Sequence, residues 1–591
     1  MGYLPELSDI TPNREFALAQ TYTGYNHNLI TEYRSDRSVT RSFYDEKNMS
    51  SVLYPVLSPR GRRGIVRTFT KPHGLHAHDR KLAWVDGTSF YYDGSNLDGN
   101  DDPMTVEDSD KQMISMGAYV LIWPDKKYYN SKTGEFGPLE ATWTAAANVT
   151  AVPSLMDGSQ INPTVAAVAP ANPADGDYWV DTTQTPHVLR RYSATLSMWN
   201  PIATTYVKIS GTGIGSQFTD LDGVTISNCP NADFNGSFVI FNRGADYIVV
   251  VGQLDAAATW TYSSSDPLKI KRDIPDMEYL TESENRIWGC NSDNHEIYAC
   301  ALGDPFNWNK FNGVSTDSYA LTVGSGGRFT GAITHLGYVL FFKEDVIHRL
   351  YGNKPANYQL TNINARGVRA GSGLSPVIVN ETLFYHSKSD VCGFASSLPQ
   401  SISDPLGNVK YVEAVGGTDS KKYYISLKDE EDNWTLFTYD IEKGMWHKED
   451  DTHMLWTANI GTDMYYIGAD NKLYSVAGNI TDYADSNAAM ESRVPWLMES
   501  GPIGLYSPDH KWITKIQIRY ETDIDTEMEV WMKYDDHPWE RKFYMTHPQH
   551  LGSDLLTILP YRCDTAKMKI VGRGGIRIYS ITHTIEGASE K

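Results

Sequence analysis

The sequence has little of what marks a membrane or secreted protein. Its longest apolar runs, Ala118–Trp123 and Tyr247–Val251, have the length of a strand and are far too short to span a bilayer. The stretch from Met1 to Asp9 has neither a basic region nor an apolar core, so we expect no secretory signal. Glu6 stands where a myristoylation signal requires Ser or Thr. These absences predict a soluble protein made in a cytoplasm.

Cysteine is scarce, with 5 residues in the chain, an odd number without a close CxxC pair. Cys290 and Cys300 lie on a predicted hairpin that turns at residues 292–295. Pairing about that turn places Cys290 near Ile297 and Cys300 near Ile287, so the two thiols do not face each other. We therefore predict free, mostly buried thiols.

Acidic residues outnumber basic ones, so the chain has a formal net charge of -21. Such an acidic protein is a poor candidate for wrapping nucleic acid, which requires clustered Lys and Arg. One basic cluster stands out, Arg60, Arg62 and Arg63, followed by Arg67 and Lys71. Two interpretations remain open: the cluster contacts phosphate, or it is a basic arm that docks on the acidic surface of a neighbouring subunit. The overall charge favours the second.

Strand signals fill most of the chain, whereas helical periodicity is almost absent. The sequence holds 37 Tyr, 15 Trp, 47 Gly and 28 Pro, a composition typical of many short strands joined by turns. A unit of apolar strand, Gly/Asn/Asp turn and aromatic strand recurs, roughly every 37 to 52 residues from about residue 277 onward, close to the length of a propeller blade. The unit is seen in 81–92, 117–129, 285–298, 337–351, 382–385, 422–439 and 463–476.

Two stretches interrupt this repeat and set the predicted domain boundaries. An Ala-, Pro- and Thr-rich sequence opens an inserted β-module, and alternating apolar and polar residues near the C-terminus predict a β-sandwich. The predicted fold class is all-β: a β-propeller with an inserted β-module and a C-terminal β-sandwich. The expected division is an N-terminal arm and docking segment at 1–59, first blades at 60–141, the insertion at 142–268, remaining blades at 269–480 and the sandwich at 490–591.

Two motifs invite a functional interpretation that their context disfavours. Gly211–Gly215 resembles a dinucleotide-binding loop, but residues 217–223 show no helix start, so we predict a turn. His73, His76 and His78 cluster, with the last two on one strand face, but they lack Cys or carboxylate partners at a known zinc spacing. We therefore expect no metal there.

An acidic loop has the spacing of a calcium site without its other requirements. Asp98, Asn100 and Asp102 are correctly spaced, but Pro103 replaces the Gly that the loop needs and Ser109 replaces the closing Glu. A solvated acidic loop is the favoured interpretation, and a different calcium geometry remains open.

Catalytic signatures are missing as well. The Asp-box repeat of sialidase propellers is not found, since Ser315–Asp317 lacks the Gly that should follow, and GxSxG and HExxH are absent. No carboxylate pair stands out for acid/base chemistry. We predict that the protein is not an enzyme, with no catalytic residues, no cofactor and no metal site.

The sequence resembles a family of structural proteins of short-tailed bacteriophages, called tail nozzle, tail hub or packaged-DNA stabilisation proteins. The resemblance covers most of the chain outside 142–268. Its residues are 22–26, 47–50, 54–60, 297–308, 341–349, 539–540, 559–564 and 578–581. In addition, Gly176–Trp179 and Arg191–Ser193 resemble small modules of phage tail and fibre proteins.

This resemblance implies a virion protein that is assembled in the bacterial cytoplasm. In the family, several copies, usually six, form a homo-oligomeric ring below the portal and adaptor, near tail fibres or spikes. The ring retains packaged DNA and conducts it during ejection, without sequence-specific binding. An acidic wall suits such a tube, because contacts that release counterions would make DNA stick.

Two other classes of protein remain open from the sequence alone. One is a receptor-binding adhesin whose aromatic blades or insertion bind a glycan. The other, less favoured, is a glycosidase propeller.

Overall fold

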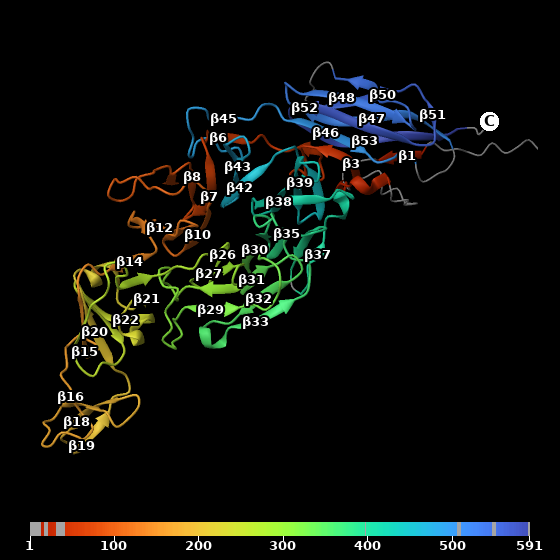
Figure 1. The fold of residues 1–591 in the computed structure, drawn as a ribbon. Helices are drawn as coiled ribbons and strands as arrows, with labels where there is room; N and C mark the ends of the chain where they lie inside the picture. Colours follow the sequence, from red (N-terminus) through yellow and green to blue (C-terminus); the bar gives the residue numbers. More distant parts are fainter. Residues whose placement is uncertain are drawn as a thin grey trace, which may run out of the picture.

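The computed structural model describes residues 13–16, 22–30, 42–395, 397–504, 510–545 and 551–588. In these ranges the regular structure consists of strands and a few short 3-10 helices (Figure 1). The predicted fold class, a β-propeller with an inserted β-module and a C-terminal β-sandwich, is confirmed. None of the helices in these ranges is long and apolar enough to cross a membrane. The N-terminal stretch 1–9, interpreted above as free of a signal, lies outside the described residues.

Seven small antiparallel sheets form the blades within the described part of the chain. Most have four strands in sequence order. The blades are β7–β9 (Pro72–His78, Lys81–Asp86, Ser89–Tyr92), β10–β13 (Gln112–Met116, Tyr119–Trp123, Lys127–Asn130, Phe136–Pro138), β26–β29 (Tyr279–Ser283, Arg286–Asn291, Glu296–Ala299, Tyr319–Thr322), β30–β33 (Gly331–His335, Tyr338–Phe342, Ile347–Tyr351, Gln359–Ile363), β34–β37 (Val377–Val379, Thr382–His386, Val391–Phe394, Gln400–Ser401), β38–β41 (Tyr411–Thr418, Lys422–Asp429, Trp434–Asp440, Met445–Lys448) and β42–β44 (Met454–Ile460, Asp463–Gly468, Lys472–Ser475) with β6 (Gly64–Thr68) and β45 (Ala489–Met490).

Tight turns join the first two strands of several blades. Asp79–Arg80, Glu284–Asn285 and Asn380–Glu381 each place two consecutive residues at positive φ, between 46° and 64°. Two such residues form the type I′ turn, whose twist matches that of a two-stranded hairpin. The local sequence thus builds each blade from short hairpins.

Hydrophobic clusters between successive blades hold the ring together. Each blade shares a buried cluster with the next, and a seventh cluster joins the last blade to the first. In that closing cluster Tyr465 and Leu473 of the last blade pack with Leu82 and Trp84 of the first. Strand β6 also pairs with β44, so a strand from near the N-terminus completes the last blade. The ring is therefore closed by pairing across nearly the whole sequence.

The inserted module leaves the propeller between β13 and β26. It begins with β14 (Ala141–Thr144) and ends with β25 (Lys269–Arg272), strands that pair with each other. An eight-stranded sheet, the base, adds β15 (Val149–Ser154), β20 (Tyr206–Ser210), β21 (Gly223–Ser227), β22 (Gly236–Gly244), β23 (Tyr247–Val251) and β24 (Ala258–Trp260). Residues 155–205, the tip, form a separate sheet of β16 (Thr164–Ala166), β17 (Tyr178–Asp181), β18 (Val188–Ser193) and β19 (Met198–Pro201). In Figure 1 the tip lies at the lower left, at the far end from the sandwich.

A buried polar network fixes the base to the third blade. Arg272 donates from Nη1 to Asp222 Oδ2 at 2.7 Å, and it also donates to the carbonyl oxygen of Leu139. The Asn307 side chain of the blade donates to Asp222 Oδ1 at 3.2 Å and accepts from the Gly223 backbone at 2.7 Å. Because these groups are buried and satisfied together, the base has a defined position against the propeller.

Both ends of the chain contribute to the C-terminal sandwich. One sheet holds β1 (Asn13–Phe16), β53 (Ile576–Gly587), β47 (Lys511–Thr522), β50 (Gly552–Thr557) and β51 (Arg562–Cys563). The other holds β2 (Gly24–Tyr25), β3 (Ser42–Lys47), β46 (Pro495–Ser500), β52 (Ala566–Arg573), β48 (Glu527–Tyr534) and β49 (Glu540–Tyr544). The segment expected as an N-terminal arm thus supplies strands of the sandwich, although parts of 1–59 lie outside the described residues.

Candidate functional site

The first strands of the blades are where a propeller enzyme would place its acids, and they carry few. First strands of neighbouring blades contact one another around the ring, as β42 does with β7. Among these seven described strands the only carboxylates are Glu282 and Glu413. Glu282 accepts a hydrogen bond from the Asn285 backbone in its own turn, and Glu413 lies 3.7 Å from the Lys428 ammonium. These contacts do not direct either carboxylate toward a second acid.

The most elaborate polar site lies where the propeller meets the sandwich. Arg60 forms a two-pronged ion pair with Glu491, at 2.7 and 2.9 Å, and contacts Asp450 at 3.0 Å. Arg63 donates to Glu449 at 2.6 Å and lies 3.1 Å from Asp450. The side chains of Arg60 and Arg63 are only 8% and 5% exposed, so this junction cluster is a buried ion network.

The hypothesis that the basic cluster is a free docking arm is therefore wrong for Arg60 and Arg63. Their guanidinium groups are used inside the subunit, where they join the segment before β6 to the last blades. Arg62 alone of the three is exposed, and its Nε donates to the Glu491 backbone at 2.5 Å. Sequence reasoning missed the acidic partners because Glu449 and Asp450 lie almost 400 residues away. The acidic run that contains Glu449 and Asp450 was the sequence signal that could have indicated partners for the arginines.

Electrostatics lower the pKa of two acids of the junction cluster, Asp450 and Glu491. Burial by itself would raise the pKa of Asp450, but Arg63 and Arg60 beside it lower that pKa to about 2. Burial likewise opposes ionisation of Glu491, and its ion pair with Arg60 lowers its pKa below the ordinary value. Charges in such an arrangement stabilise the fold only while each keeps its partner.

A second buried pair connects the same two domains. His447 on β41 lies 2.7 Å, Nδ1 to Oε1, from Glu46 on β3, and both side chains are at most 1% exposed. Within the part of the chain that the structure describes, Glu46 Oε2 and His447 Nε2 have no hydrogen-bond partner. Desolvation raises the pKa of Glu46 despite the counteracting effect of His447. The pair thus places an incompletely satisfied acid and base at the interface.

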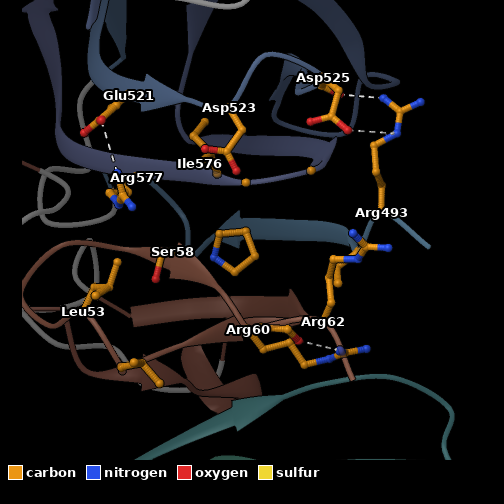
Figure 2. Close-up of a pocket in the computed structure, with 16 residues that line it drawn as sticks. Leu53, Ser58, Arg60, Arg62, Arg493, Glu521, Asp523, Asp525, Ile576 and Arg577 are labelled. Carbon is orange, nitrogen blue, oxygen red and sulfur yellow. Dashed lines mark hydrogen bonds and ion pairs between the residues drawn. The ribbon is translucent and has the colours of Figure 1, made fainter. Parts of the chain in front are cut away.

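A cavity of about 420 Å³ opens beside the junction cluster (Figure 2). Its wall is formed by the N-terminal segment on one side and the sandwich on the other, and it mixes both signs of charge. Arg577 lies 3.2 Å from Glu521, and Arg493 donates to the Asp525 backbone at 2.5 Å. Three carboxylates stand beside the four arginines of the wall, and Arg60 is already paired with Glu491, so the cavity lacks the strong positive field that a phosphate ligand requires.

The Gly211–Gly215 loop is a turn, as predicted. Gly213 has φ 71° and precedes a four-residue 3-10 helix, Ile214–Gln217. The Gly213 N–H donates to the Asp246 carboxylate at 2.7 Å, where a nucleotide loop would present its N–H groups to a phosphate. A carboxylate at this place is incompatible with a phosphate cradle.

The three histidines each bind a different neighbour. His73 bridges Asp108 and Asp110 at 2.7 and 2.8 Å, a carboxylate environment that sequence spacing did not reveal. His76 and His78 lie on one strand and contact Ser115 and Ser131. Burial lowers the pKa of His76 to about 4, so this ring is neutral at pH 7. Across the described residues no group of three His, Cys, Asp or Glu side chains is arranged to hold a metal ion.

The acidic loop uses its first carboxylate for its own folding. Asp98 Oδ1 accepts the backbone N–H groups of Asn100 and Asp102 at 2.8 and 2.9 Å. Such side-chain to backbone bonds are typical of Asx turns. The loop is exposed, in keeping with the solvated interpretation.

All five cysteines are free and buried, as predicted. Cys290 pairs with Ile297 in the β27–β28 ladder, and the Cys300 backbone bonds to that of Ile287, which confirms the predicted register. Burial raises the pKa of the Cys300 thiol to about 12 and that of Cys563 to about 11. These thiols are protonated at pH 7 and therefore poor nucleophiles.

Comparison with known proteins gives only distant likenesses. No family model and no curated protein matches the chain. Among solved structures, an exo-β-1,3-galactanase from Phanerochaete chrysosporium is 9% identical over 51% of this chain and 94% of its own, with a TM-score of 0.21. A chain of a mitotic checkpoint complex is 9% identical over 66% and 92%, with a TM-score of 0.25. An engineered family 43 glycoside hydrolase is 7% identical over 54% and 98%, with a TM-score of 0.20. Such scores carry no inference about function.

Proposed function

We propose that the protein is a structural subunit of a short-tailed bacteriophage tail, part of the nozzle below the portal and adaptor. The observation that carries this proposal is the position of the residues that resemble that family. Tyr22 is buried in the sandwich core, Asn48 donates to the Pro495 carbonyl oxygen, and Arg60 belongs to the junction cluster. The N-terminal part of the resemblance therefore includes residues that join propeller and sandwich, as expected for a shared scaffold.

Two further features support a scaffold over an enzyme. The described first strands carry only two carboxylates, and each has a local structural partner. The net charge of -21 suits the wall of a tube through which DNA must move without being held. A glycosidase propeller has less support, because the two carboxylates of the described first strands are each held by a local partner.

Assembly is the first test of the proposal. The purified full-length protein is imaged by negative-stain electron microscopy, alone and with an adaptor–portal complex from a short-tailed phage. We expect ring-shaped oligomers with an open channel. A protein that stays monomeric under both conditions and turns over a polysaccharide would contradict the proposal.

Binding of DNA is the second test. A tube that conducts DNA should bind free duplex weakly, with a shallow dependence of log affinity on log salt, because few counterions are released. Fluorescence anisotropy with a labelled duplex at 50 to 300 mM salt measures this slope. A steep slope that Arg62→Ala abolishes would show that the exposed arginine grips DNA.

A further inference from the structure

The tip of the inserted module has one core face and one open face. Cα partners in an antiparallel sheet share a face, and Val180 pairs with Leu189. These two residues form the hydrophobic cluster of the tip with Ile161, while Tyr178 and Ile202 pack against it. The tip therefore has its small core on the face that carries Val180.

The opposite face carries the largest aromatic residues of the tip. Trp179 pairs with Arg190, and Tyr192, two residues further along β18, pairs with Trp199. The ring centroids of Trp179 and Trp199 are 5.6 Å apart, and those of Tyr192 and Trp199 are 5.3 Å apart. Open faces of antiparallel sheets are normally polar. Here three rings from three strands form a continuous aromatic face, and two of them, Tyr192 and Trp199, are partly exposed.

Exposed apolar residues lie in the loops beside the strands that carry this aromatic face. Val168 follows β16 and Leu196 lies in the turn between β18 and β19, and they are 78% and 62% exposed. Exposed apolar and aromatic residues gathered in one small module mark interaction sites in soluble proteins. The tip also lies at the end of the molecule opposite the sandwich, where a large partner has access to it (Figure 1).

Charge limits what the aromatic face can bind. Residues 155–205 contain four Asp and two Arg, so the tip is acidic overall. Arg190 is already engaged, because its guanidinium lies 5.7 Å from the Trp179 ring centroid and 3.1 Å from Asp181. Arg191, the other arginine of the tip, lies on the opposite face, because it pairs with Tyr178. A nucleic acid or an anionic polysaccharide would therefore meet net repulsion at a face whose arginine is already paired. The suitable ligand is uncharged, with an apolar surface for the rings and hydroxyls for the polar rim.

Sugars of the hexopyranose type meet both requirements. Their C–H faces pack on aromatic rings, and Tyr and Trp combine apolar area with a polar group. Thr183, whose hydroxyl donates to Asp181 beside Arg190, is exposed and offers a polar group at the edge of this face. We propose that Tyr192 and Trp199, which pack on the buried Trp179, form a binding surface for neutral hexopyranose units of a polysaccharide. This proposal does not depend on the nozzle assignment.

The chain offers a clean deletion for the test. Ser154 and Tyr206 are Cα partners at the ends of β15 and β20, so residues 155–205 can be replaced by a two-residue Asn-Gly turn. The point variants Tyr192→Ala and Trp199→Ala remove rings of the aromatic face. Trp199→Phe keeps a ring beside Trp179, and Met198→Ala changes an exposed neighbour on the other face.

Affinity gel electrophoresis of the full-length protein in dextran, mannan and galactan gels measures binding. We expect retardation by at least one of these neutral polysaccharides, at least tenfold weaker binding in both Ala variants and none after tip excision. Trp199→Phe should retain most of the binding, and Met198→Ala all of it. No retardation in any gel, retardation that survives tip excision, or binding only to heparin or duplex DNA would overturn the proposal. None of these results bears on ring assembly.

Discussion

The sandwich and the inserted module are both appended to the propeller, but they are attached in opposite ways. The sandwich is built from both ends of the chain. The buried Glu46–His447 pair joins its strand β3 to the sixth blade, and the junction cluster holds the segment before β6 against the last blades. The module leaves and re-enters between two consecutive blades, through strands β14 and β25 that pair with each other. The first attachment couples distant parts of the sequence, whereas the second leaves the module's outer part thermodynamically separable. The following four experiments test this difference.

Breaking the junction cluster should have the largest effect. Arg63→Met leaves Glu449 and Asp450 buried without one of their partners, a loss of about 3–5 kcal/mol in unfolding free energy. Arg62→Met, at the exposed neighbouring position, should change stability by at most about 0.5 kcal/mol. Urea unfolding followed by tryptophan fluorescence measures both. Equal losses would show that the buried ion network does not couple the domains.

Substitutions that create a cavity should destabilise the whole propeller in one region and only the tip in the other. Leu473→Ala, in the cluster that closes the ring, should destabilise the whole propeller by about 2–5 kcal/mol. Leu189→Ala, in the core of the tip, should speed hydrogen exchange only within 155–205. Hydrogen exchange with mass spectrometry resolves the two patterns. Global loss of protection in Leu189→Ala would contradict a separable tip.

The Glu46–His447 pair makes a prediction about pH. Because the pKa of Glu46 is raised in the folded state, its contribution to stability is full below the ordinary value and is lost as pH rises through the folded-state value. Glu46→Gln removes this titration, so its unfolding free energy should fall less with rising pH across that window, by up to about 1.4 kcal/mol per pH unit.

Urea titrations of wild type and Glu46→Gln between pH 4 and 8 give this difference. Groups remote from Glu46 titrate equally in both proteins and cancel in the difference between the two curves. Parallel curves for the two proteins would show that Glu46 does not titrate differently on folding.

Excising the tip should have the smallest effect on the body. Replacement of 155–205 by the Asn-Gly turn leaves the base and its buried network with Asn307 intact. We expect the main unfolding transition to shift by at most about 0.5 kcal/mol. Differential scanning calorimetry measures it. A large drop, or loss of soluble expression, would mean that the tip supports the propeller.

Local features of the fold were predictable from the sequence. The hairpin register at Cys290 and Cys300 followed from a four-residue turn, and the Gly211–Gly215 turn followed from the missing helix signal. Both depend only on neighbouring residues, where strand period and turn chemistry are decisive.

Features that depend on distant pairing were not predictable. Burial of Arg60 and Arg63 requires Glu449, Asp450 and Glu491, which no local pattern connects with them. The aromatic face of the tip likewise depends on the register that brings Tyr192 opposite Trp199. The sequence of an arginine cluster shows its charge, but it does not show whether the side chains are exposed or buried.

The pairing of β6 with β44 has a consequence for synthesis. Translation adds about 5–20 residues per second. Strand β6 ends at Thr68, and its partner Lys472 is made roughly 400 residues later, a wait of about 20–80 s at that rate. During this time the edge of β6 has no native partner on the nascent chain, and unpaired edges promote association between chains. The propeller therefore closes late, and clustered copies on one polysome face their greatest risk of mispairing before the last blade emerges.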